Sequence, residues 1–261
     1  MKPGRPLALA YATLLIVTNG AAAQETCQRE TIGSARVATV IDGRTFTLDD
    51  GRTVRLAGIE LPPASGNDGR VRAAKAALAS LLSGQTITLK RSGIGQDRYG
   101  RLLVYAFREN KDDESVNVAL LAAGYGRAMP GDASKVCAAP LFAAEARARA
   151  AGLGLWADPF FAPLQAEVPE QILAARGRFA LVEGKVLSVR EAGATIYVNF
   201  GRRWSRDFTV TILKRNRRIF MAAGVEPKAF EGHRIRVRGV IERRGGPIIE
   251  AVHPEQIEVI E

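Results

Sequence analysis

Two tight-turn signals close together in the chain constrain its fold more than any other feature. Asp42-Gly43 and Asp49-Asp50-Gly51 each separate segments in which apolar and polar side chains alternate. Alternation with a period of two is typical of strands with one buried face, and Asp-Gly pairs favour hairpin turns. The predicted strands cover residues 35–42, 44–49 and 52–60. Pro62-Pro63 should end the third strand, because proline cannot donate to the ladder.

The period of the pattern changes after this meander. Apolar side chains recur at helical spacing at Val71, Ala74, Leu78, Leu81 and Leu82. They predict a helix over residues 69–82, which Gly84 ends. Strands are predicted over residues 85–91 and 101–108, and short helices over 115–123 and 138–151. Three strands, a helix, two strands and trailing helices is the order of a five-stranded OB-type barrel with added helices.

The second half of the chain repeats this order after a break. Three prolines between Asp158 and Pro169 indicate a linker, which we assign to residues 159–170. Beyond it, the pattern predicts strands over 177–190, 194–200 and 207–213, a helix over 214–223, and strands over 233–242 and 247–260. We therefore expect a mainly β protein with helices, of class α+β. A first barrel over residues 24–158 precedes a second, OB-like barrel over residues 171–261.

Three short motifs within residues 35–158 resemble those of one enzyme family. They comprise Ile41, Asp42, Gly43 and Thr45, then Arg55, Leu56 and Pro62, then Asp97, Tyr99, Gly100 and Arg101. In order and spacing they are similar to the motifs of the staphylococcal nuclease (thermonuclease) family. The resemblance implies a barrel at one end of which the motifs hold a calcium ion and a phosphodiester. It also implies that Arg55 and Arg101 take the places of two phosphate-gripping arginines, for which a forked guanidinium is suited.

The chain departs from the family at the acids that the chemistry uses. Arg44 stands where the family has a calcium-binding Asp, and Pro63 stands where it has the catalytic Glu. Glu60 replaces a second Asp ligand, and Leu61 replaces a Thr. An arginine in place of a ligand costs on the order of 10 kcal/mol, whereas a whole micromolar calcium site supplies about 8 kcal/mol. We therefore expect no metal and no other cofactor. The family-equivalent catalytic positions are Arg55, Arg101 and Glu60.

Two interpretations of the basic residues at this site stay open. Strand alternation points Arg44 toward the barrel end rather than to solvent. In the first interpretation, Arg44, Arg55 and Arg101 form an anion-binding pocket without metal. In the second, Arg44 pairs with Glu60 and fills the former metal site. The need of a buried charge for a partner favours the second.

The first residues of the chain have the pattern of an export signal. Lys2 and Arg5 precede an apolar segment over residues 7–17, and Ala21-Ala22-Ala23 follows it. This pattern is typical of a cleavable signal peptide, here residues 1–23. The apolar segment is shorter than the roughly 20 residues that span a bilayer. We therefore expect an exported protein, either periplasmic or secreted.

The chain contains two cysteines, Cys27 and Cys137. Export would place them in an oxidising compartment, where an even number of cysteines favours a disulfide over free thiols. A bridge between them would close a long loop, worth ~4–5 kcal/mol in the chain-entropy model. We therefore predict a Cys27–Cys137 disulfide.

Basic side chains are in excess in the second half. Residues 166–261 contain 17 Lys and Arg against 12 Asp and Glu. They gather at Arg202, Arg203, Trp204 and Arg206, and again at Lys214, Arg215, Arg217 and Arg218. An aromatic ring beside arginines on an OB-type face can hold a single nucleic-acid strand. The alternative is a solvated basic face with Trp204 in the core.

These observations predict an exported thermonuclease-like protein, a catalytically degenerate nuclease homologue that binds nucleic acid or another polyanion. The clustered charge of the second barrel is expected to dominate that binding. One alternative is an active metal-dependent phosphodiesterase, an endonuclease acting on DNA or RNA through a rearranged site. Another is a structural protein of the envelope that contacts an anionic membrane or cell-wall surface.

Overall fold

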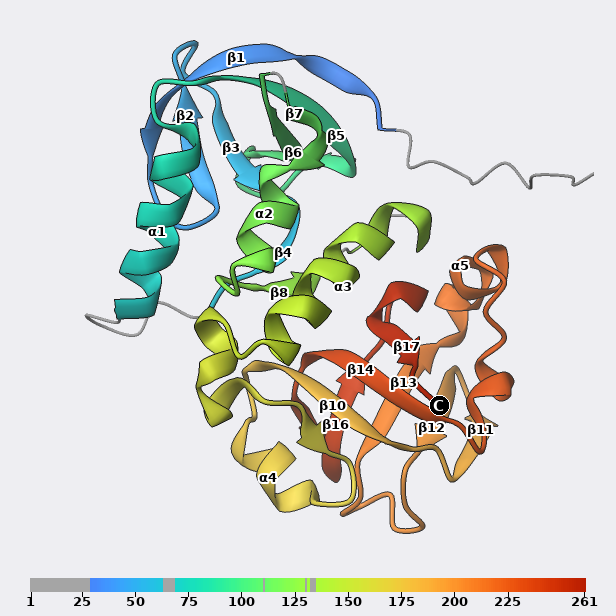
Figure 1. Cartoon of the computed structure of the whole chain (residues 1–261). Coiled ribbons are helices and arrows are strands. Elements are labelled where there is room, and N and C mark those ends of the chain that lie inside the picture. The colour runs from blue at the N-terminus through green and yellow to red at the C-terminus, as the bar shows by residue number, and fades with distance from the viewer. Residues whose placement is uncertain (1–28, 63–68, 110, 130, 132–134) are drawn as a thin grey trace, which may run out of the picture.

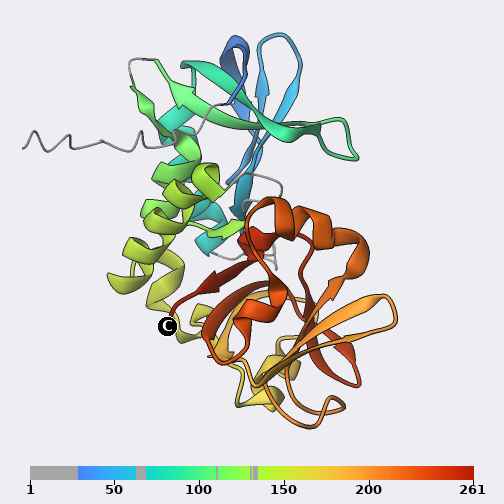
Figure 2. The same ribbon diagram turned by 90° about the vertical axis from the view of Figure 1, so that its right-hand side faces the viewer.

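The structure, a computed structural model, describes residues 29–62, 69–109, 111–129, 131 and 135–261. It consists of two β-barrel lobes, one above the other in Figure 1, with helix α3 (Lys135–Ala150) between them. Figure 2 shows the same arrangement from the side. Each lobe has its own core of buried apolar side chains, within residues 37–144 and within residues 166–257. We call them the N-lobe and the C-lobe.

The N-lobe contains a closed barrel of five strands. They are β1 (Thr31–Val40), β2 (Thr45–Leu48), β3 (Thr53–Leu56), β5 (Thr86–Gln96) and β6 (Leu102–Arg108). Neighbouring strands are antiparallel, except that β3 and β6 pair in parallel and close the barrel. Phe46, Leu48, Val54 and Leu56 point into the core, as the alternation predicts. The predicted OB-type barrel is confirmed.

The third predicted strand is divided in two. β3 ends at Leu56, and β4 (Gly58–Glu60) pairs with β8 (Arg127–Met129) outside the barrel sheet. Gly58 has a φ of 73°, which side-chain-bearing residues rarely adopt, and a Cβ there would lie 2.7 Å from Leu141 Cδ1. The break at Gly58 therefore takes Glu60 off the barrel wall. The alternation of residues 52–60 does not reveal it.

Helices cover the N-lobe barrel. α1 (Gly69–Leu82) has the bounds that the sequence predicts and buries Ala74, Leu78 and Leu82. α2 (Val116–Ala122) is capped by Ser115, whose side chain accepts a hydrogen bond from Val118 N. β7 (Lys111–Ser115) precedes α2, and η1 (Gly154–Ala157) follows α3.

The segment expected to be a linker has regular structure. It contains the 3-10 turn η2 (Pro159–Phe161), the short strand β9 (Leu164–Gln165) and the start of α4 (Pro169–Ala174). Pro159 and Pro169 stand in the first turns of η2 and α4, where a missing N–H leaves no intrahelical bond unmade. β9 pairs in parallel with β10 (Phe179–Lys185) and so joins the sheet of the C-lobe.

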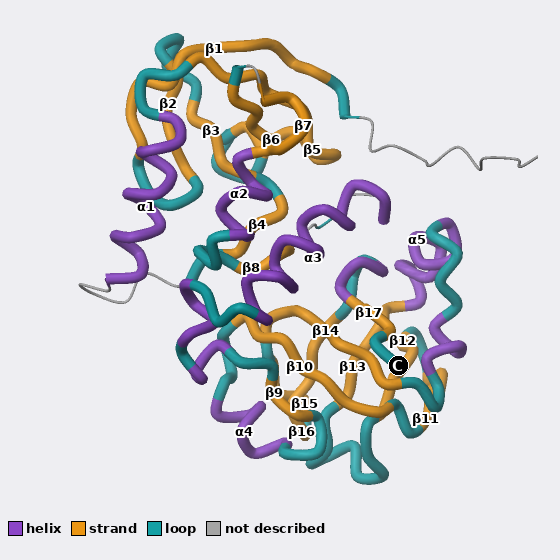
Figure 3. Tube along the Cα trace, in the orientation of Figure 1, coloured by secondary structure: helices purple, strands orange, loops and turns teal. Residues whose placement is uncertain are grey.

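The C-lobe shares part of the strand pairing of the N-lobe, but its strands form two sheets. Its further strands are β11 (Ser188–Ala192), β12 (Thr195–Asn199), β13 (Thr209–Leu213), β14 (Arg234–Val240), β15 (Glu242–Arg244), β16 (Gly246–Glu250) and β17 (Ile257–Val259). The strand orders of the two sheets are β17-β14-β10-β9 and β11-β12-β13-β16-β15. Its helical segments are η3 (Lys214–Asn216), α5 (Arg217–Ala222), η4 (Pro227–Phe230) and η5 (Pro254–Gln256). β13 and β16 pair in parallel, as β3 and β6 do. Figure 3 shows α5 beside the strands of this OB-like lobe.

A buried arginine connects the two lobes. Arg238 on β14 is 0% exposed, and its Nη1 donates to Glu145 Oε2 on α3 at 3.0 Å and to Ala128 O on β8 at 2.6 Å. Its Nη2 pairs with Glu258 of β17. The guanidinium carbon lies 4.4 Å from the centroid of the Phe142 ring. The buried charge of Arg238 therefore has partners outside its own lobe as well as within it. The C-lobe supplies the arginine, and α3 and β8 supply two of the groups that it needs.

A second buried arginine reaches across the same boundary. Arg127 on β8 is 5% exposed, and its Nη1 donates to Phe179 O at the start of β10 at 2.6 Å. Burial lowers the pKa of Arg127 to about 10. In the β4–β8 pairing, Arg127 stands opposite Glu60.

The predicted disulfide can be tested by mass. Cys137 is buried in α3, whereas Cys27 lies outside the described residues, as does the predicted signal peptide. Arg29 Nη2 donates to Cys137 O at 2.8 Å, so the segment that follows Cys27 reaches α3. We expect protein exported by its own signal to begin near Gln24 and to take up a thiol-alkylating reagent, in denaturant, only after reduction. Two alkylated thiols without reductant would contradict the bridge.

No described helix is long and apolar enough to cross a membrane.

Candidate functional site

The first segment of the site is the turn between β1 and β2. Ile41 N donates to Thr45 O at 2.8 Å, and Asp42 Oδ1 accepts from Arg44 N at 2.8 Å. The Asp42 carboxylate thus holds the turn, as aspartates in this position commonly do. Gly43 has no room for a side chain, because a Cβ would lie 2.7 Å from the Cβ of Ala74 on α1. The turn is therefore pressed against α1, and its conformation places Arg44 beside β4.

Arg44 pairs with Glu60. Its Nη1 donates to Glu60 Oε2 at 2.8 Å and to Ile59 O at 2.6 Å. The two side chains are 15% and 28% exposed, so the pair is largely shielded from water. This contact favours the second of the two interpretations, in which Arg44 fills the site. One guanidinium nitrogen thus contacts one carbonyl oxygen and one carboxylate oxygen of β4.

Arg55 lies beside this pair and has no salt bridge with the described part of the chain. On β3 it is half-buried, and its guanidinium makes no hydrogen bond or salt bridge with another described residue. Burial lowers the pKa of Arg55, and the positive charges of Arg44 and Arg101 lower it further, against the opposing effect of Glu60 and Asp42. The three arginines are thus close enough to act on one another.

Arg101 is neutralised within its own turn. Its Nε and Nη2 donate to Asp97 Oδ2 at 2.7 and 2.6 Å, and its backbone N donates to Asp97 Oδ1. Tyr99, in the same turn, is 66% exposed, and the Arg101 guanidinium lies 5.1 Å from the centroid of its ring. Asp97 therefore occupies the donors that a bidentate phosphate contact would use.

These side chains line one small cavity at the barrel end. A cavity of about 190 Å³ is lined by Asp42, Gly43, Arg44, Arg55, Glu60, Leu61, Pro62, Val71 and Ala74. Arg101 does not line it. With Arg44 held by Glu60, Arg55 is the basic side chain of this lining that makes no salt bridge with a described residue. The structure therefore brings the three predicted arginines together, but does not make a pocket of three free cations.

Comparison with known proteins gives a match to one family over part of the chain. Residues 53–158 match the family model described as staphylococcal nuclease homologue. Over these residues the N-lobe is similar to the staphylococcal nuclease homologues. The match begins at β3, so the turn with Arg44 precedes it, and the pairing of β1 with β2 and β5 places that turn in the barrel. No curated protein matches the chain.

The residues at this site do not fit the calcium ion that the matched family implies. Calcium takes six to eight oxygen ligands. Here Glu60 Oε2 and Ile59 O already accept from the Arg44 guanidinium, and Asp42 Oδ1 accepts from a backbone N–H. Within the described part of the chain, no three His, Cys, Asp or Glu side chains gather as metal ligands would. Pro63, at the position of the catalytic Glu, lies outside the described residues.

The C-lobe divides the predicted basic cluster into two groups. Arg202, Arg203, Trp204 and Arg206 lie in the loop before β13, and Lys214, Arg215, Arg217 and Arg218 follow its other end. In the second group, Lys214 and Arg217 both pair with Glu191, at 3.1 Å each. Arg206 pairs with Glu170. The two groups are therefore separate patches, each partly neutralised.

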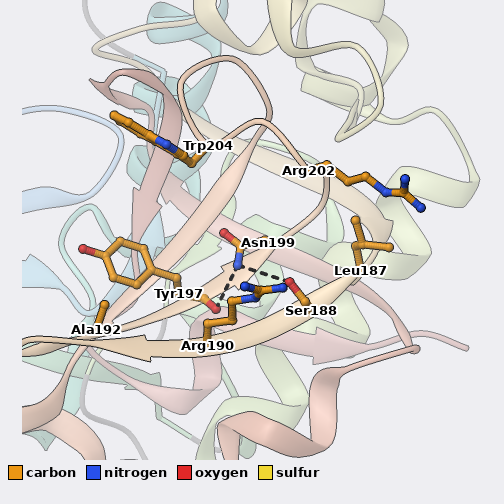
Figure 4. A pocket seen from close by; sticks show the side chains of 9 residues that line it. Leu187, Ser188, Arg190, Ala192, Tyr197, Asn199, Arg202 and Trp204 are labelled. Carbon is orange, nitrogen blue, oxygen red and sulfur yellow. Dashed lines mark hydrogen bonds between the residues drawn. The ribbon is translucent and has the colours of Figure 1, made fainter.

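Trp204 lies outside the core of the C-lobe. Its side chain is 73% exposed, so the alternative that places it in the core is wrong. It borders a cavity of about 780 Å³ on the outer face of β11 and β12 (Figure 4). The cavity is lined by Leu187, Ser188, Arg190, Ala192, Tyr197, Asn199, Gly201, Arg202 and Trp204.

Sequence reasoning missed Tyr197 and Arg190. Tyr197 alternates with Ile196 and Val198 on β12, and those two are buried in the core, so its ring points outward. Arg190 stands opposite Tyr197 in the pairing of β11 with β12. The alternation of β12 could have shown that Tyr197 points outward. Placing Arg190 beside it also needs the register in which β11 and β12 pair, and a single sequence does not reveal that register.

Proposed function

We propose that this protein is an exported staphylococcal nuclease homologue that binds a nucleic acid or similar polyanion and does not cleave it with calcium. The observation that carries the loss of cleavage is the Arg44–Glu60 pair, in which the guanidinium occupies Glu60 Oε2 and Ile59 O. Export rests on the signal-like pattern of residues 1–23. An active phosphodiesterase with a rearranged site and an envelope-binding protein are the alternatives that the experiments below separate.

Binding is assigned chiefly to the C-lobe. Arg190 and Arg202 line its large cavity, and neither guanidinium lies within salt-bridge distance of a described carboxylate, although the charge of Arg190 acts on Glu231 from further away. In the N-lobe, by contrast, Arg44 and Arg101 are engaged by Glu60 and Asp97. A phosphate that binds an arginine already paired with a carboxylate must displace that carboxylate. An arginine without such a partner binds phosphate at a lower cost, so the C-lobe surface is the favoured binding site.

The dependence of binding on salt tests this proposal. The full-length protein should bind single-stranded DNA or polyphosphate at low salt, and the affinity should fall steeply as salt rises, because neutralised phosphates release counterions. Replacing both Arg190 and Arg202 with alanine should reduce the slope of log affinity against log salt by roughly 1.4 for a single strand. Fluorescence anisotropy at several salt concentrations measures that slope.

The matched control replaces Arg215 and Arg218, which also have no acidic partner among the described residues. Arg217 is avoided because its loss would release Glu191 and Glu226. The full chain is used instead of a fragment over residues 166–261, because that fragment would leave Arg238 without Glu145. Absence of polyanion binding at low salt would contradict the proposed function. A response to anionic vesicles in place of nucleic acid would support the envelope alternative.

A further inference from the structure

The outer sheet face of the C-lobe carries a second cavity next to the first. About 320 Å³ in volume, it is lined by Thr195, Tyr197, Trp204, Thr209, Thr211, Arg244 and Ile248. Tyr197 and Trp204 line both cavities. The two rings therefore stand between two adjoining recesses, each of a size typical of small-ligand clefts. We call the cavity of about 780 Å³ the large recess and the other the small recess.

Trp204 is exposed but held in place. Phe200 N donates to Phe208 O, and Asp207 Oδ2 accepts from Arg203 N at 2.8 Å, so the loop is closed by its own bonds. The Trp204 ring lies against Gly245 in the turn between β15 and β16, where a Cβ would come within 2.9 Å of the ring. An exposed aromatic fixed in this way loses little conformational freedom when a planar ligand stacks on it.

Polar groups line both recesses. In the large recess, Asn199 Nδ2 lies 3.4 Å from Ser188 Oγ, and Figure 4 shows both between the two rings on one side and Arg202 on the other. In the small recess, the Thr211 hydroxyl is buried and has no hydrogen-bond partner among the described residues. Thr195 and Thr209 line the same recess, so its wall is partly polar.

We infer that a single strand of nucleic acid crosses this face, with one base stacked on the exposed part of Trp204 and a neighbouring base against Tyr197. The inference rests on the proposed function and names its ligand and its site. Aromatic rings that stack with unpaired bases, and arginines without acidic partners for the phosphates, are the combination that single-strand binders use. A duplex hides its base faces, and a neutral glycan has no use for the unpaired charge of Arg190 and Arg202.

Titration with a single-stranded DNA of about 12 nucleotides tests this inference. The chain has two tryptophans, so Trp156→Phe leaves Trp204 as the one reporter of fluorescence. We expect the DNA to quench Trp204. Trp204→Ala and Tyr197→Ala should each weaken binding about 10- to 100-fold, whereas Trp204→Phe and Tyr197→Phe should lose much less, because phenylalanine still stacks.

Two controls separate this inference from the proposed function. Polyphosphate has no bases, so its binding should be the same for Trp204→Ala as for the unmodified protein. A duplex of the same sequence should bind more weakly than the single strand. If single-stranded DNA and polyphosphate both bind but the alanine variants change neither, the stacking site is wrong and the proposed function stands. If neither ligand binds at low salt, the proposed function fails and this inference fails with it.

Discussion

Replacing Arg238 with methionine is expected to lower the free energy of unfolding by about 3–5 kcal/mol. The change would leave the Glu145 carboxylate, 1% exposed, with the N–H of Ala128 at 2.8 Å and Arg149 at 3.6 Å as its remaining partners. Methionine preserves most of the volume, so the loss is mainly that of the charge partner. Thermal unfolding followed by circular dichroism should show a fall in Tm of roughly 6–20 °C.

Two comparisons make this result specific. Arg206→Met removes an ion pair with Glu170 in which both side chains are more than 60% exposed, and it should leave Tm almost unchanged. Replacing both Arg238 and Glu145 with methionine should recover part of the lost stability, because no unpaired carboxylate then remains on α3. If Arg238→Met shifts Tm no more than Arg206→Met does, the buried pair contributes nothing to stability and the lobes are not joined by it.

Adding calcium is expected to leave hydrolysis of single-stranded DNA and RNA by the unmodified protein at the background rate. The Arg44 guanidinium holds the oxygens of Glu60 and Ile59 and places a positive charge where a divalent cation would need a ligand. At an effective dielectric near 20, the interaction between two unit charges in contact is worth about 4 kcal/mol. Exchanging an acid for an arginine changes the local charge by two units, so its electrostatic cost exceeds the binding free energy of a micromolar calcium site. Release of acid-soluble nucleotides with calcium and with a chelator measures this.

Variants of Arg44 separate charge from ligation. Arg44→Asp should gain weak calcium binding by calorimetry, whereas Arg44→Met removes the charge without supplying an oxygen and should gain less. Cleavage should stay absent in both, and Arg44→Asp with Pro63→Glu is the combination in which weak activity is expected, because it restores a carboxylate that can orient water. Calcium-dependent turnover by the unmodified protein that Arg55→Ala abolishes would contradict this view and favour the active phosphodiesterase.

Local signals in the sequence were sufficient for most of the first barrel. The Asp-Gly turns and the alternation around them predict β1, β2 and β3, and the helical spacing predicts α1 with its observed bounds. These features are decided by residues near one another in the chain, through turn conformation and the period of burial. Element order was likewise enough to predict an OB-like second barrel, and the family motifs were enough to predict that Arg44, Arg55 and Glu60 meet.

Tertiary structure alone decided what those residues do. That Gly58 breaks the strand follows from the approach of Leu141 and Tyr105, far along the chain. Whether Trp204 is core or surface depends on the turn at Gly245, and the place of Tyr197 beside it depends on strand register. The burial of Arg238 against Glu145 exists only when the two lobes are in contact. Each of these contacts joins residues distant in the chain, and the energy of a buried charge or an exposed ring depends on such neighbours and not on its own segment.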